Sequence, residues 1–74
     1  MLDAEEAYQQ YRDMVYGYLI RLCRDRDLAE ELTQETFYQA MKNWKRYEGK
    51  SSVGTWLCAI ARNQFLRICL LYTS

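Results

Sequence analysis

Apolar residues recur at steps of three and four through the first third of the chain, which is the spacing of one face of an α-helix. A capping signal precedes this stripe, because Asp3 is followed three positions later by Glu6, and acidic side chains are favoured in a first turn. We therefore predict a first helix over residues 3–24. Its apolar stripe consists of Ala7, Tyr8, Tyr11, Met14, Val15, Tyr18, Leu19, Leu22 and Cys23.

A second helical pattern follows an expected break at Asp25 and Arg26. Asp27 and Glu30 repeat the capping spacing, so this helix is predicted from Asp27 to about Arg46. Its core stripe consists of Leu28, Ala29, Leu32, Thr36, Phe37, Ala40 and Trp44. At ~100° per residue, four other side chains share the opposite side of the helix and form one outward patch. The outward patch consists of Glu31, Gln34, Glu35 and Tyr38.

A third helix is predicted after a loop over residues 47–52. Gly49 suits a left-handed helix end, and the serines that follow suit an N-cap. The helix is expected from about Ser52 to at least Phe65. Its core stripe consists of Val53, Trp56, Leu57, Ile60 and Ala61.

The last stretch departs from this pattern because its apolar residues surround most of the helix circumference. Residues 68–74 resemble a translated sequencing-adapter tail, which carries no information about function. We therefore predict two parts: a helical domain over residues 1–65 and a non-native tail over residues 66–74.

The composition of the 74 residues favours one small all-α domain, since proline is absent and glycine occurs three times. No apolar run reaches the ~20 residues of a membrane helix and no secretory signal opens the chain, so we expect a cytoplasmic protein without a membrane partner. Histidine is absent, which excludes histidine-based catalytic triads and metal helices and predicts a protein that is not an enzyme. Glu31 and Glu35 alone supply too few metal ligands, so neither a metal nor a cofactor is expected.

The charges are divided unevenly along the chain. Residues 1–35 carry nine acids and four bases, whereas residues 36–74 carry one acid and six bases. This division indicates a basic partner for the first half and an anion such as nucleic acid for the second. A chance distribution over a solvated surface is the alternative. Asn63 lies about 20° from Trp56 around the third helix, so a ring and an amide share one flank of the cationic half.

Two motifs carry a resemblance to a known family. The segment E-L-T-Q-E-T-F covers residues 31–37, and T-W-L-C-A-I-A-R-N covers residues 55–63. In this order and spacing they resemble region 2 of the extracytoplasmic-function sigma factors of bacterial RNA polymerase. The resemblance implies a three-helix bundle like sigma-70 region 2, here C-terminally truncated.

The resemblance also implies partners. The first motif would dock on the β′ clamp helices through Glu31, Gln34 and Glu35, and the helical wheel adds Tyr38. The loop and third helix would melt and read the promoter −10 element on the non-template strand, and an anti-sigma factor is a further candidate partner. The residues expected to bind DNA are Lys45, Arg46, Tyr47, Lys50, Ser51, Ser52, Thr55, Trp56, Arg62 and Asn63. Val53 stands where the family usually has an aromatic residue, which implies a shallower base pocket or a different preferred base.

Two other functions remain open at this point. A duplex-reading helix-turn-helix regulator would insert the third helix into the major groove. A helical protein-interaction module would bind no nucleic acid. Trp56 is likewise open between a core residue and a base-stacking one, and a half-buried ring serves both roles.

Overall fold

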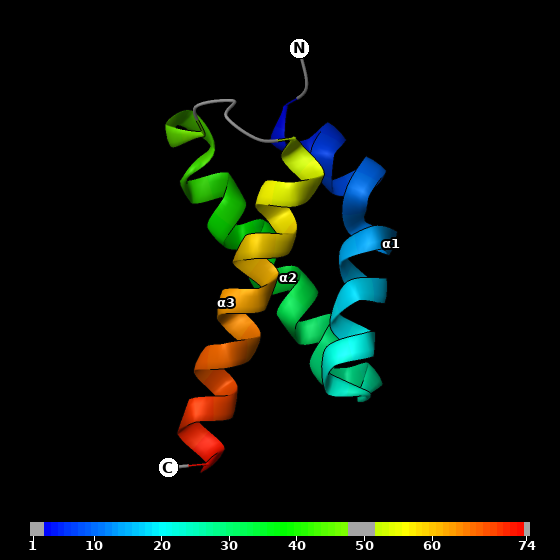
Figure 1. Cartoon of the computed structure of the whole chain (residues 1–74). Coiled ribbons are helices and arrows are strands. Elements are labelled where there is room, and N and C mark those ends of the chain that lie inside the picture. The colour runs from blue at the N-terminus through cyan, green and yellow to red at the C-terminus, as the bar shows by residue number, and fades with distance from the viewer. Residues whose placement is uncertain (1–2, 48–51, 74) are drawn as a thin grey trace.

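Three helices and one short turn account for almost all of the chain that the computed structural model describes, residues 3–47 and 52–73. The helices are α1 (Ala4–Cys23), α2 (Arg26–Lys42) and α3 (Val53–Thr73), and a 3-10 turn, η1 (Trp44–Arg46), follows α2. They pack as a bundle in which every helix contacts the other two (Figure 1). The predicted all-α three-helix fold is confirmed. None of the described helices combines the length and apolar character that crossing a bilayer requires.

Helix α1 has the ends that the sequence indicates. The Asp3 carboxylate accepts a hydrogen bond from the Glu6 backbone N–H at 2.8 Å. At the other end Arg24 adopts a left-handed conformation (φ 54°), and its N–H donates to the Ile20 carbonyl at 2.9 Å. The prediction of a helix over residues 3–24 is therefore confirmed.

The start of α2 differs from the prediction. Asp25, not Asp27, is the N-cap, since its carboxylate accepts hydrogen bonds from the backbone N–H groups of Asp27 and Leu28 at 3.0 and 3.2 Å. Arg26 is consequently the first helical residue. Spacing to Glu30 favoured Asp27, but an aspartate at the cap position satisfies two free N–H groups without any glutamate partner.

The end of α2 also comes earlier than Arg46. Helix α2 stops at Lys42, and the chain continues through η1, in which the Arg46 N–H bonds to the Asn43 carbonyl at 2.9 Å. The Asn43 side chain donates to the Gln39 carbonyl at 2.9 Å and so occupies an acceptor at the end of the helix. The Asn43 backbone N–H bonds to the same carbonyl at 3.1 Å, so side chain and backbone of Asn43 together cap this end of α2.

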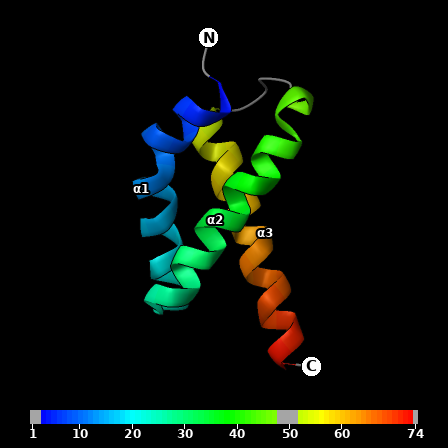
Figure 2. The ribbon, with the colours of Figure 1, turned by 180° about the vertical axis from the view of Figure 1, so that it is seen from behind.

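Helix α3 begins at Val53, close to the expected position. The Ser52 hydroxyl accepts a hydrogen bond from the Thr55 N–H at 3.2 Å, and the Ser52 carbonyl accepts one from Trp56 at 3.0 Å. Gly49 lies outside the described residues. Beyond Phe65 the helix continues without interruption to Thr73, extending past the ends of α1 and α2 (Figures 1 and 2).

The tail over residues 66–74 stays a prediction. Within it Ile68 is half-buried and packs against the core, whereas Leu70 and Leu71 are largely exposed. Ile68 therefore belongs to the packing of the bundle in this structure.

The core combines alanines with larger apolar residues. Its buried hydrophobic members are Ala7, Val15, Leu19, Ala29, Leu32, Ala40, Leu57 and Ala61. Thr36 is fully buried among them, and its hydroxyl donates to the Leu32 carbonyl at 2.7 Å, so its polar atom has a partner. The central positions of all three predicted stripes are thus confirmed.

Some residues of the first predicted stripe are more exposed than expected. Tyr8, Met14 and Leu22 are 38–44% exposed, although they were predicted to face the core. Tyr16 and Ile20, which lie outside that stripe, pack against the core instead. Helix α1 contacts both α2 and α3, so its buried face differs from one wheel stripe.

Candidate functional site

The outward patch lies on the surface of α2, as its wheel position predicts. Glu31 and Gln34 are exposed, and Tyr38 is 51% exposed. Glu35 is half-buried, and its carboxylate accepts a hydrogen bond from the Gln39 side chain at 3.1 Å. This bond restrains Glu35, so the patch presents an ordered carboxylate next to an aromatic ring.

The outward patch borders two different grooves. Gln34 lines a cleft between α1 and α2, together with Tyr8, Arg12 and Glu30. Glu31 and Glu35 line a groove between α2 and α3, whose other walls are Leu28, Leu32, Gln64, Ile68 and Leu71. A partner helix laid on α2 would therefore meet acidic side chains on the α3 side and a mixed polar cleft on the α1 side.

Tyr38 has a cation beside it. The Lys42 ammonium lies 5.3 Å from the centre of the Tyr38 ring, within the range of a cation–π contact. One turn of α2 separates the two residues, so the contact is a local one. It restrains an exposed ring.

The predicted DNA-binding residues cluster around η1 and α3. Lys45 and Arg46 are exposed on η1, and Ser52 and Thr55 are exposed at the start of α3. Ser52 donates its hydroxyl to the Thr55 hydroxyl at 2.8 Å. Lys50 and Ser51 lie outside the described residues.

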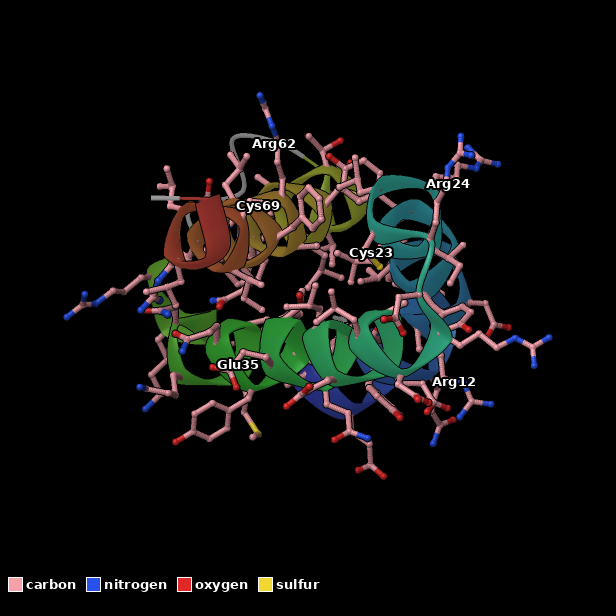
Figure 3. The ribbon with its side chains drawn as sticks, turned by 90° about the horizontal axis from the view of Figure 1, so that it is seen from below. Arg12, Cys23, Arg24, Glu35, Arg62 and Cys69 are labelled. Carbon is pink, nitrogen blue, oxygen red and sulfur yellow. The ribbon has the colours of Figure 1, made fainter. Side chains whose placement is uncertain are left out.

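Arg62 and Asn63 are both exposed farther along α3. Figure 3 shows Arg62 extending from α3 on the side away from α2, whereas Glu35 lies on α2. Arg62 and Glu35 therefore lie on different helices, and Arg62 points away from the helix that carries the outward patch.

Asn63 and Trp56 share a flank of α3 but are two turns apart. Because α3 is continuous between them, the seven residues correspond to about 10 Å along the axis at ~1.5 Å per residue. Successive nucleotides of a strand are spaced by at least ~3.4 Å. A base stacked near Trp56 and a base bound by Asn63 would therefore belong to different nucleotides of the same strand.

Trp44, Tyr47 and Trp56 form an aromatic cluster that the sequence did not indicate. The ring centres of Tyr47 and Trp56 lie 4.8 Å apart at 31°, and Trp44 meets Trp56 at 5.7 Å and 61°. Trp44 and Tyr47 complete the triangle at 6.5 Å. Trp44 was expected to continue the core stripe of α2, but the helix ends before it, and its ring contacts Tyr47 and Trp56 instead.

Trp56 combines the two roles that were left open. It is half-buried and packs against the core, and it also carries the ring of Tyr47. Core packing therefore fixes the position of Trp56. The aromatic cluster lies where η1 follows α2 and where α3 begins.

The cysteines take part in packing and backbone contacts. Cys58 is half-buried between α1 and α3, and this burial raises the pKa of its thiol, which keeps the thiol neutral near pH 7. The Cys23 thiol donates to the Asp25 carbonyl at 3.4 Å. Within residues 3–47 and 52–73, no group of three or more cysteine and acidic side chains is arranged to hold a metal ion.

The chain is similar to known proteins over most of its length. The family model Sigma-70 region 2 matches residues 7–69. The ECF RNA polymerase sigma factor SigM of Bacillus subtilis is 42% identical over 62 residues, which cover 84% of this chain and 37% of SigM. YlaC, an RNA polymerase sigma factor of the same bacterium, is 36% identical over 84% of this chain and 36% of its own length.

A third relative, the ECF RNA polymerase sigma factor BldN of Streptomyces coelicolor, is 41% identical over 76% of this chain and 22% of its own length. The chain thus spans little more than a third of the length of SigM and YlaC. No solved structure matches it.

Proposed function

The chain belongs to the sigma-70 region 2 family, and we propose that it acts in transcription initiation as the part of a sigma factor that binds RNA polymerase and promoter DNA. The outward patch on α2 docks on the β′ clamp helices. The region from η1 to Asn63 binds and melts the −10 element through its non-template strand. One observation carries this proposal: the acidic patch of α2 and the exposed Arg62 of α3 lie on different sides of the bundle (Figure 3).

The docking part of the proposal rests on charge and on one exposed ring. Glu31, Gln34 and Glu35 offer carboxylate and amide groups that suit a basic helical partner, because complementary charge raises the association rate and sets the register. Tyr38, half-exposed beside them, is the type of side chain that anchors interfaces. The grooves on both sides of α2 provide room for the partner's side chains.

The DNA part rests on three kinds of group at the other end of the chain. Lys45, Arg46 and Arg62 are exposed cations that suit phosphates. The aromatic cluster provides ring surface, and stacking on aromatic rings is worth ~1–3 kcal/mol per base. The exposed Asn63 amide has both a donor and an acceptor, which a base edge requires.

An anti-sigma factor would act on this arrangement by covering one of the two faces. An anti-sigma factor bound to the outward patch would prevent polymerase binding, and one bound to α3 would prevent DNA binding. Measuring which of the two binding reactions is lost distinguishes these cases.

A binding assay with a β′ clamp-helix fragment tests the docking assignment. Glu35→Lys places a cation at the centre of the outward patch and Gln34→Ala removes an amide, and each should weaken binding about tenfold or more. Glu6→Lys is the matched control, since it makes the same charge change at an exposed position of α1. Equal binding by Glu35→Lys and Glu6→Lys, with both proteins folded by circular dichroism, would reject the assignment.

A further inference from the structure

The connection between α2 and α3 is held at both of its ends. On the first side the Tyr47 N–H donates to the Trp44 carbonyl at 3.2 Å and closes η1. On the second side Ser52 caps α3 through the Thr55 N–H. Both ends of the connection therefore have defined backbone positions.

Aromatic contacts then join the two ends to each other. Tyr47 belongs to the first end and Trp56 to the second, and their rings lie 4.8 Å apart at 31°. Trp44 contacts both, at 6.5 Å from Tyr47 and 5.7 Å from Trp56. Because Trp56 also packs against the core, the triangle ties η1 and Tyr47 to the body of the bundle.

We propose that Trp44 is a positioning residue for promoter-strand binding: together with Tyr47 and Trp56 it forms a clasp that holds η1, which carries Lys45 and Arg46, against the start of α3 in the arrangement that binds DNA. This inference rests on the proposed function of η1 and α3. Trp44 itself need not touch DNA, since it acts through the rings of Tyr47 and Trp56. The clasp lowers the entropy that η1 loses on binding, which is the general advantage of a preorganised site.

The alternative device is a lid, in which Tyr47 covers the face of Trp56 that a base would use and must leave before DNA binds. The geometry favours the clasp, because the Tyr47 ring contacts Trp44 as well as Trp56 and would lose both contacts on leaving. The two devices predict opposite effects of removing the Tyr47 ring. A clasp loses affinity, whereas a lid gains it.

The experiment compares variants of the 74-residue chain in binding to a fluorescent single-stranded −10 oligonucleotide at fixed salt. Trp44→Leu keeps apolar bulk but removes the ring, and Trp44→Phe restores a ring. The clasp predicts that Trp44→Leu weakens binding about five- to tenfold, which corresponds to the free energy of one or two aromatic pairs. Trp44→Phe should bind the oligonucleotide within about twofold of wild type. The dependence of affinity on salt should not change, since no cation is removed.

Two further measurements separate positioning from loss of fold. Binding of the β′ clamp-helix fragment should be the same in wild type and Trp44→Leu, because the outward patch lies on another face. In Trp44→Phe the remaining tryptophan is Trp56, so its fluorescence reports the cluster directly, and adding Tyr47→Leu should shift its emission. An unchanged emission would show that Tyr47 does not stack on Trp56 and would overturn the clasp.

The outcomes also separate this inference from the proposed function. Wild-type chain that shows no salt-dependent binding of the oligonucleotide would overturn the DNA part of the function. Normal wild-type binding with no loss in Trp44→Leu would overturn the clasp alone. Tighter binding by Tyr47→Leu would also overturn it and identify Tyr47 as a lid.

Discussion

Gly54, in the first turn of α3, faces the Tyr11 ring of α1 so closely that a Cβ at position 54 would lie 3.2 Å from Tyr11 Cε1. The same Cβ would lie 3.0 Å from the end of Met14. The absence of a side chain here lets α3 begin directly against α1. The capped start of α3, which carries the proposed DNA-binding residues Ser52 and Thr55, thereby lies against the bundle.

Gly17 provides the matched comparison for Gly54. It lies within α1, and a Cβ there would meet no side chain or other element within 4 Å. Gly17→Ala should raise the free energy of unfolding by ~0.5–1 kcal/mol through helix propensity alone. Gly54→Ala should lower it by about 1 kcal/mol, because the half-buried Tyr11 ring must shift. Thermal melts measure both, at roughly 4–8 °C per kcal/mol for a chain of this size; equal melting temperatures would contradict the close packing.

The N-cap of α2 gives a second pair of variants with unchanged charge. Asp25→Glu should lower the free energy of unfolding by ~1 kcal/mol, because the longer side chain is a poor substitute for the aspartate that bonds the N–H groups of Asp27 and Leu28. Asp27→Glu keeps an acid in the first turn and should stay within ~0.5 kcal/mol of wild type. Urea titrations distinguish the two, and the reverse order would make Asp27 the cap.

Asn63 and its neighbour Arg62 should affect DNA binding in different ways. Asn63→Ala should weaken binding to one base at one position of a −10 oligonucleotide, by ~1–3 kcal/mol relative to the other bases, since a base edge loses its partner. Arg62→Ala should weaken binding to all sequences alike and reduce the salt slope by about 0.7, the value for one phosphate contact on a single strand.

Oligonucleotide series at several salt concentrations provide both measurements. A uniform loss in Asn63→Ala would assign Asn63 to packing or to phosphate contact. Tighter binding of wild type to duplex than to single strand would favour the helix-turn-helix alternative, in which α3 enters the major groove.

Much of the fold follows from spacing in the sequence, and particular residues show where spacing is insufficient. Leu19, Leu32 and Leu57 lie at the centres of three apolar stripes and are all buried as predicted. The family was identified from two motifs, and the match over residues 7–69 confirms it. Periodicity succeeds here because each helix buries a face against both of the others.

The local errors both concern the ends of α2, where single side chains bond to backbone groups. Asp25 takes the cap of α2 from Asp27, and Asn43 binds the Gln39 carbonyl near the end of the same helix. A helical wheel contains neither effect. Because α2 ends before Trp44, the aromatic cluster that joins Trp44 to Tyr47 and Trp56 could not be derived from the wheel.

The surface positions of the candidate site were more predictable than its contacts. Glu31 and Gln34 are exposed as their wheel angles require, and Asn63 is exposed although it shares a flank with the half-buried Trp56. The hydrogen bond between Glu35 and Gln39 and the Lys42–Tyr38 contact depend on side-chain conformations, which sequence spacing permits but does not determine. The roles of these residues in binding stay proposals.

The central claim is that polymerase and promoter strand use separate faces of this bundle. The most direct measurement is binding of the labelled −10 oligonucleotide in the presence of saturating β′ clamp-helix fragment, with wild type, Glu35→Lys and Asn63→Ala. We predict that wild type binds both at once, that Glu35→Lys loses only the fragment, and that Asn63→Ala loses only the DNA preference. Displacement of the oligonucleotide by the fragment, or loss of both activities in either variant while it remains folded, would contradict the account.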